Sequence, residues 1–371
     1  MEYNIVNYAE ENMDTFAQRA FCPVDSLILS WLSYLRIPGD APEFRDWEGL
    51  PLSSLYRAEW FDKLFLGVWD PESSRRLLTA LAASPRFRSL RVMGYTEQMD
   101  PEAEKQFSAV TFRLTEGLSY VAFRGTDASF VGWKEDFNMA FQTVPSQETA
   151  VAYLARAALY CPGRLMTGGH SKGGNLAVYA AACCDEAVQG RILRIYSHDG
   201  PGFLAEMLTS PGFQAIADRV EKTLPQSSVV GMLLEDQESF QLVKSGRVSF
   251  WQHDPFSWQV EGDRFCPADH LTADAHYLDK TLNDWVRGLA QEERERFVDA
   301  LYGILNVNEV TTFAQWQDQW QKNLSDTMKA ASQMDPDTRK FLGHTLKELA
   351  ALSVKHFPEL WAKEEKEKKE P

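Results

Sequence analysis

The spacing of apolar and polar residues divides the chain into three regions. Up to about residue 89 the pattern favours helices. In Pro71–Ser84 apolar residues recur at helical spacing, and the proline suits the first position of a helix. The stretch Val24–Ile37 is too densely apolar for a surface helix with a single buried face. The N-terminal region is therefore expected to be mainly helical.

From residue 90 to about residue 260 the pattern changes to short strand-like runs separated by glycine-rich and polar turns. Phe107–Leu114 and Leu118–Gly125 flank Thr115-Glu116-Gly117, which predicts a β-hairpin. Further on, "RLMTGG" is followed by an alanine-rich helical pattern and then by Arg191–Gly200. This order of strand, glycine turn, helix and strand predicts a βαβ unit within a parallel sheet.

From about Thr272 onward the pattern is helical again, and the final "KEEKEKKEP" is interpreted as a solvated chain end. The sequence contains no internal repeat and no low-complexity linker. We therefore expect a single domain over residues 1–371. It would consist of a helical N-terminal region (1–89), a core (90–270) and a helical C-terminal region (271–371).

Composition narrows the class of protein. The 371 residues are 44% hydrophobic and 25% charged, which is typical of a water-soluble globular protein. A net charge of −15 disfavours nucleic-acid binding and gives no attraction to anionic lipid. The acidic N-terminal stretch does not resemble a signal peptide, and no apolar run reaches the roughly 18 residues of a membrane helix. Five cysteines without metal-ligand spacing complete the expectation of a cytoplasmic protein with free thiols and no integral membrane association.

The most informative segment is "TGGHSKGGNLAVYAAA", in which Ser171 occupies the centre of a G-x-S-x-G pattern. A nucleophilic serine at the end of a strand needs a tight turn, and Gly169 and Gly173 leave room for one. The helix that follows would place the backbone N–H of Lys172 and the positive end of the helix dipole beside the serine. Ser171 is therefore the candidate nucleophile, and Lys172 is a candidate donor to an oxyanion.

A second donor is expected upstream, because in an α/β-hydrolase it comes from the loop after an early strand. The apolar strand pattern that begins at Tyr120 ends in Arg-Gly-Thr, which makes Thr126 the candidate. Arg124 is interpreted as a structural residue in a buried ion pair, with Asp136 or Asp127 as its partner.

These segments resemble a known family. "VAFRGT" with a following W..DF, and then "GHSKGGNLA", are similar to the pattern of class 3 lipases in the α/β-hydrolase superfamily. The full ordered set resembles a bacterial family of class 3 lipase-like hydrolases, and it also includes "VDSLILSWLSYL", "SHDGPGF", "PQSSVVGMLL" and "QHDPFSW". The resemblance implies an α/β-hydrolase fold with a mostly parallel central sheet, a nucleophile elbow and helical additions at both ends.

In this fold the catalytic residues follow one another along the chain as serine, acid and histidine. Asp199 in "IYSHDGPGF" follows the strand after the nucleophile helix, and a similar turn holds the acid in lipases that resemble the pancreatic type. In class 3 lipases the acid comes one strand later, where this chain has Ser227 and Ser228. Asp199 is our first choice as the acid, with Glu235 and Asp236 as alternatives.

For the base, the chain order excludes His170 and makes His198 a poor candidate. His253 in "FWQHDPFSW" follows a strand-like run, and class 3 lipases have a comparable late histidine. His270 is the rival, while the remaining histidines (His276, His344 and His356) lie on helical patterns and are expected to be inert.

The resulting hypothesis is a serine hydrolase that cleaves a small-molecule acyl ester or a lipid-like ester without a metal or a cofactor. The aromatic-rich Glu59–Asp70 favours an apolar acyl pocket covered by helices. The alternative is a hydrolase fold kept as a binding or scaffold protein. The observation that distinguishes the two hypotheses is whether a carboxylate reaches His253.

Overall fold

The structure is a computed structural model of the chain. It describes residues 3–100, 102, 105–126, 139, 143–228, 230–233, 239–247 and 249–272, together with scattered positions from 275 to 344. Most of the predicted C-terminal helical region (271–371) lies outside the described residues. None of the described helices is long and apolar enough to cross a membrane.

A central sheet of eight strands, in the spatial order β1 to β8, organises the described part of the chain. The pairings from β1 to β4 are antiparallel and those from β4 to β8 are parallel, so Ser171, which follows β5, lies in the parallel half. A separate hairpin joins β9 and β10. The strands are β1 (Leu50–Pro51), β2 (Arg91–Asp100), β3 (Lys105–Thr115), β4 (Leu118–Phe123), β5 (Arg164–His170), β6 (Ile192–His198), β7 (Val220–Pro225), β8 (Gln241–Val243), β9 (Val260–Glu261) and β10 (Arg264–Phe265).

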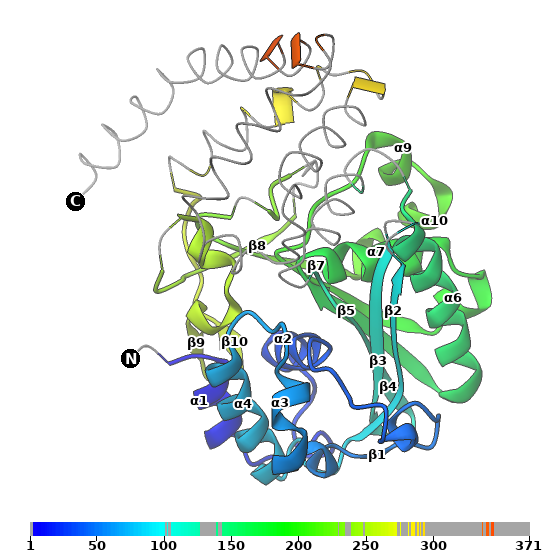
Figure 1. The fold of residues 1–371 in the computed structure, drawn as a ribbon, viewed down its shortest axis with the longest axis vertical. Helices are drawn as coiled ribbons and strands as arrows, with labels where there is room; N and C mark the ends of the chain where they lie inside the picture. The colour runs from blue at the N-terminus through cyan, green and yellow to red at the C-terminus, as the bar shows by residue number, and fades with distance from the viewer. Residues whose placement is uncertain are drawn as a thin grey trace.

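Helices cover both faces of this sheet (Figure 1). The described α-helices are α1 (Ile5–Glu11), α2 (Pro23–Leu32), α3 (Phe61–Leu64), α4 (Pro71–Ala83), α6 (Pro145–Tyr160), α7 (Lys172–Cys183), α8 (Glu186–Gln189), α9 (Ala205–Leu208) and α10 (Pro211–Gln214). Six short 3₁₀-helices lie between them in the described chain: η1 (Pro42–Phe44), η2 (Leu52–Leu55), η3 (Ala58–Trp60), η4 (Ala217–Arg219), η5 (Ser249–His253) and η6 (Pro255–Ser257).

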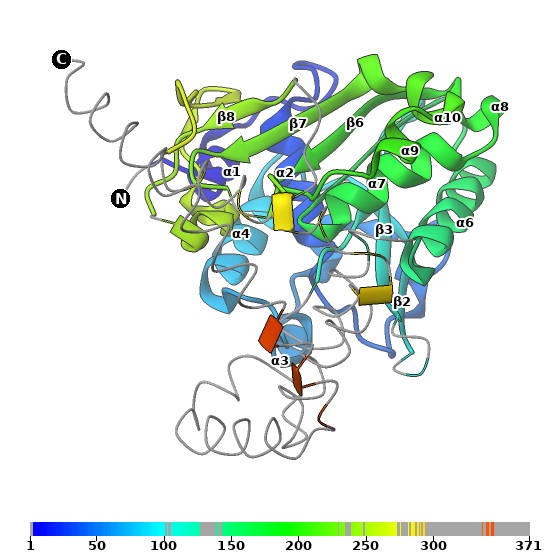
Figure 2. The ribbon, with the colours of Figure 1, turned by 90° about the horizontal axis from the view of Figure 1, so that it is seen from above.

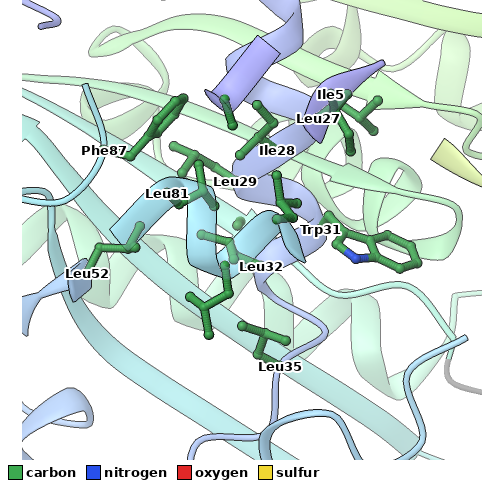
Figure 3. Packing of buried hydrophobic residues seen from close by; sticks show 14 of the residues in the cluster. Ile5, Leu27, Ile28, Leu29, Trp31, Leu32, Leu35, Leu52, Leu81 and Phe87 are labelled. Atoms are coloured by element: carbon green, nitrogen blue, oxygen red, sulfur yellow. The ribbon is translucent and has the colours of Figure 1, made fainter. Parts of the chain in front are cut away.

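The alternation of side chains along β4 divides the core between the two faces of the sheet. Tyr120 and Ala122 belong to the apolar cluster formed with α1, α2 and α4, whereas Val121 and Phe123 belong to the cluster formed with α6 and α7. Figure 3 shows the first cluster, with Leu27 and Leu81 among its buried side chains. Seen from above, α6, α7 and α10 lie together beside the parallel strands (Figure 2). β4, β5 and β6 each contribute side chains to both clusters, so these three strands are packed on both faces.

Several expectations about local structure are confirmed. β3 and β4 form the predicted antiparallel hairpin, and β5, α7 and β6 form the predicted βαβ unit. The helix expected at Pro71–Ser84 is α4, with its proline in the first turn. The helix expected over Val24–Ile37 ends earlier, at Leu32. The N-terminal region also contributes β1 to the sheet, which its helical pattern does not predict.

Candidate active site

Ser171 lies on a strained turn between β5 and α7. Its backbone φ of 58° and ψ of −133° are unusual for a residue with a side chain. Two hydrogen bonds hold this conformation. The Ser171 N–H donates to the carbonyl of His198 at 2.9 Å, and the Ser171 carbonyl accepts from the Gly174 N–H at 2.9 Å. The serine is therefore fixed at the carboxyl end of β5, with α7 beginning at the next residue.

The glycines around this turn are required by close backbone approach. A Cβ on Gly169 would stand 2.2 Å from the backbone of Gly173. A Cβ on Gly173 would stand 2.1 Å from the carbonyl oxygen of Phe123 on β4. Neither position tolerates a side chain, since real contacts to a Cβ do not come this close. The G-x-S-x-G spacing thus follows from the geometry of the elbow.

Lys172 contributes backbone rather than side chain to the site. It is the first residue of α7, where the N–H groups have no acceptor within the helix and the positive end of the helix dipole lies. Its ammonium group is buried and donates to the carbonyl of Gln106 on β3 at 2.9 Å. The side chain therefore ties the elbow to the antiparallel half of the sheet.

The loop after β4 lies directly against Ser171. A Cβ on Gly125 would come within 3.0 Å of the Ser171 Cβ and within 2.1 Å of the Tyr34 hydroxyl. Thr126, the next residue, lines a pocket together with His253. The arrangement brings Thr126 and Lys172 to the same part of the molecule as Ser171, where the sequence places an oxyanion site.

Asp199 follows β6 and has a positive φ of 51°. Its buried carboxylate accepts three hydrogen bonds. Oδ1 accepts from the Ser228 hydroxyl at 2.5 Å and from the Gly231 N–H at 3.2 Å, while Oδ2 lies 2.6 Å from Nδ1 of His253. A carboxylate held by several donors keeps a single orientation, and here that orientation faces the imidazole.

His253 is the last residue of the 3₁₀-helix η5. Its side chain is 23% exposed, whereas that of Asp199 is 1% exposed. Since Oδ2 of the carboxylate can only accept, Nδ1 of His253 donates the hydrogen of this bond. The pair thus joins a buried carboxylate to a partly accessible imidazole.

A pocket of about 450 Å³, its open mouth included, lies beside His253. Aromatic rings make up much of its wall, and Trp31 and Tyr34 form a stacked pair with ring centroids 4.6 Å apart. Trp69 and Trp251 are 47% and 53% exposed, and their ring centroids lie 6.2 Å apart. The lining residues are Trp31, Tyr34, Trp69, Thr126, His170, Trp251, His253, Asp254 and Pro255. Such a wall suits an apolar group next to the base.

Burial changes the pKa of three groups near the site. It lowers the pKa of His198 to about 3, and it holds the pKa of His170 well below its usual value, with a further contribution from His253. Burial also lowers the pKa of Lys222 on β7 to about 7, although the charge of Asp199 opposes this shift. The two histidines are therefore neutral at pH 7.

The remaining candidates are either exposed or outside the described residues. His270 is exposed, and so is His344, while His276 and His356 lie outside the described residues. Glu235 and Asp236, the alternative acids, also lie outside them.

Arg124 has a carboxylate partner that the sequence did not suggest. Its guanidinium group donates to Glu97 on β2 at 2.8 Å. Asp127 and Asp136, which the sequence offered as partners, lie outside the described residues.

Sequence reasoning did not identify the residues that hold the acid and the base. Ser228 and Gly231 bind the Asp199 carboxylate, and Tyr34 contacts the elbow. The segment "PQSSVVG" belongs to the ordered set of motifs, but nothing in its pattern of residues indicates a contact with Asp199.

A sheet with a parallel half, and a serine on a strained strand-to-helix turn, define the α/β-hydrolase fold. A family model described as Mbeg1-like matches residues 81–303, which is more than half of the 371 residues. The chain belongs to the Mbeg1-like family.

Two solved structures are similar to part of the chain. One is a fungal lipase in complex with an inhibitor, with 17% identity and a TM-score of 0.35, covering 59% of this chain and 75% of that chain. The other is M37 lipase, with 16% identity and a TM-score of 0.34, covering 57% of this chain and 69% of that chain. The comparison with curated proteins gives no match.

Proposed function

We propose that the protein is a serine hydrolase of the carboxylesterase or lipase-like type, with Ser171 as nucleophile, His253 as base and Asp199 as acid. The observation that carries the proposal is the 2.6 Å hydrogen bond between Nδ1 of His253 and Oδ2 of Asp199. A carboxylate in this position fixes the tautomer of a catalytic histidine and stabilises its protonated form. We also propose that the enzyme acts in the cytoplasm, in keeping with its five free cysteines.

In the proposed reaction Nε2 of His253 removes the proton of the Ser171 hydroxyl as the oxygen attacks the ester carbonyl. The N–H groups of Lys172 and Thr126 donate to the oxyanion that forms, and the helix dipole of α7 favours the negative charge. His253 then protonates the leaving alcohol, and an acyl-enzyme remains on Ser171. Water, deprotonated by His253, releases the acid and restores the serine.

The substrate class follows from the pocket. Its wall of Trp31, Tyr34, Trp69 and Trp251 favours an ester with an apolar group, which would contact the rings while the carbonyl faces the serine. An acyl ester or lipid-like ester satisfies this requirement, and the chemistry needs no metal and no cofactor.

The alternative is a hydrolase fold that only binds or scaffolds. Such a protein would have no need for a buried carboxylate on His253. The three hydrogen bonds that orient Asp199 toward His253 favour the enzyme.

Labelling with a fluorophosphonate tests the proposal, because only an activated serine reacts rapidly with it. The intact mass of the wild type should increase by one adduct, which Ser171→Ala abolishes and His253→Ala slows greatly. His270→Ala is the matched control and should label at the wild-type rate. Folded wild-type protein that forms no adduct, or an adduct that survives in Ser171→Ala, would contradict the proposal.

A further inference from the structure

His170, the residue before the nucleophile, makes a direct contact with the base. Its ring Nε2 lies 2.8 Å from the backbone carbonyl oxygen of His253, across 83 residues of sequence. A carbonyl oxygen can only accept, so Nε2 of His170 carries the hydrogen and donates it. The two imidazole rings lie close together as well, with centroids 4.5 Å apart.

The other nitrogen of His170 also has a partner. Because Nε2 carries the hydrogen, Nδ1 keeps its lone pair, and the Tyr34 hydroxyl lies 3.2 Å from it. The ring is 3% exposed and is surrounded by aromatic side chains, with Trp31 and Trp258 at its edges. His170 therefore has one tautomer and little freedom to turn.

The His253 segment is held at two neighbouring carbonyls. Trp258 Nε1 donates to the carbonyl of Gln252 at 2.8 Å, and His170 donates to the next one, that of His253. The imidazole of His253 is in turn bound by Asp199. The backbone and the ring of His253 are thus fixed by different residues, one on β5 and one after β6.

The neutrality of His170 matters as much as its hydrogen bond. When a base takes a proton from the serine it becomes an imidazolium, and a second cation 4.5 Å away would oppose that step. Burial keeps His170 neutral at pH 7. It can therefore hold His253 without repelling the charge that forms there.

We propose that His170 is a positioning residue for the base, which it orients by donating its Nε2 hydrogen to the backbone carbonyl of His253. A histidine at this position does more than fill the second place of the G-x-S-x-G pattern. Its role in the reaction rests on the proposed function, whereas its effect on the orientation of His253 does not.

The test compares two neutral amides. His170→Gln places a side-chain N–H near the position of Nε2, whereas the shorter His170→Asn does not reach it. The first measurement is the downfield proton resonance of the Nδ1 hydrogen that His253 shares with Asp199, assigned by its loss in His253→Ala. We expect this resonance to persist in the wild type and in His170→Gln, and to broaden or disappear in His170→Asn.

The second measurement is the rate of fluorophosphonate labelling. A misplacement of a catalytic group by about 1 Å can cost about 10²-fold in rate, so His170→Asn should lose about that much while His170→Gln recovers most of it. His198→Phe is the control, because it removes a buried histidine whose ring Nε2 contacts Ser26 rather than His253. It should keep both the resonance and the rate.

The outcomes separate the two proposals. Wild-type protein without labelling would contradict the proposed function, and the resonance would still test the role of His170. A sharp resonance in His170→Asn, with labelling at the wild-type rate, would overturn that role. Should His170→Asn fail to fold, His170→Phe replaces it, since the phenyl ring fills the space without donating. A sharp resonance there, with labelling at the wild-type rate, would overturn the role equally.

Discussion

The hydroxyl of Ser228 donates to Oδ1 of Asp199 at 2.5 Å. Ser228 follows β7 and Asp199 follows the neighbouring β6, so the contact crosses between the ends of two parallel strands. The Gly231 N–H supports the same oxygen at 3.2 Å. The position after β7 therefore supplies a donor to the Asp199 carboxylate, which follows the strand before it.

The first prediction concerns Ser228→Ala. Loss of one of the two donors to Oδ1 should loosen the carboxylate and cost about 1.5–3 kcal/mol of unfolding free energy, the usual value for a hydrogen bond to a charged group. Labelling of Ser171 should slow as well. Urea unfolding and adduct formation measure the two effects. Ser227→Ala is the matched control, because its hydroxyl contacts Thr272 instead. Equal losses in both variants would contradict the role assigned to Ser228.

The second prediction concerns Asp199→Asn. An amide cannot stabilise the protonated form of His253 and can select the wrong tautomer, so the rate of acyl transfer should fall by about 10⁴-fold. The measurement is hydrolysis of a chromogenic ester, with far-ultraviolet circular dichroism to verify folding. Glu235→Gln and Asp236→Asn test the alternative acids. A larger loss in either of these than in Asp199→Asn would reassign the acid.

The third prediction concerns the elbow glycines. Gly173→Ala would place a Cβ 2.1 Å from the carbonyl oxygen of Phe123, which should cost about 3 kcal/mol of unfolding free energy by overpacking. Gly39→Ala is the control, since nothing lies within 4 Å of the position that its Cβ would take. That variant should remain within about 0.5 kcal/mol of the wild type. Comparable denaturation midpoints for the two variants would show that the close approach of Gly173 to Phe123 does not limit the size of the residue at this position.

The elbow could be predicted because its determinants lie within a few residues of one another. The spacing of Gly169, Ser171 and Gly173 reflects contacts between β4, β5 and α7 that any chain must satisfy in this turn. The choice of Asp199 rests on chain order, on its turn at the end of a strand and on the similarity of that turn to pancreatic-type lipases; its strand, β6, pairs with β5 in the sheet.

The contacts that support Asp199 and His253 from elsewhere in the chain could not be predicted. Ser228 is 29 residues from Asp199 and His170 is 83 residues from His253. Neither contact leaves a periodic pattern, because each depends on how separate segments meet at the end of the sheet. The two-residue strand β1 is missed for a simpler reason, since it is too short to show alternation.

The fourth prediction concerns the pH dependence of stability. The folded pKa of His198 is about 3, below the ordinary value of 6.5, so between these values the unfolded chain binds a proton that the folded chain does not. Stability should therefore fall as the pH decreases from 6 to 5, by about 1.4 kcal/mol per pH unit for this histidine. His170, whose pKa is also lowered, contributes in the same direction.

Urea unfolding of His198→Phe at pH 6 and pH 5 tests this. In the variant, the dependence of the unfolding free energy on pH should be smaller than in the wild type by about 1.4 kcal/mol per pH unit. This difference does not depend on the absolute stability of the variant. Ser26→Ala is the control, because it removes the hydrogen-bond partner of His198 but keeps the imidazole, and its slope should match the wild type. An unchanged slope in His198→Phe would contradict the prediction.

The fifth prediction concerns the aromatic pocket beside His253. Trp69 forms part of the wall near Trp251, and its ring is half exposed, so it can be truncated without opening the core. Trp69→Ala should raise KM for an ester with an apolar acyl chain by about tenfold, equivalent to about 1.4 kcal/mol, and leave kcat nearly unchanged. The effect should shrink as the acyl chain is shortened to acetyl, because the smallest chain makes the fewest contacts with the ring.

Steady-state hydrolysis of an ester series from acetyl to decanoyl measures this dependence. Tyr56→Ala is the matched control, since Tyr56 is also an exposed aromatic residue, 43% accessible, but does not line the pocket. Its kinetic constants should equal those of the wild type across the series. A loss in Trp69→Ala that is independent of chain length would mean that the apolar part of the substrate does not contact this wall.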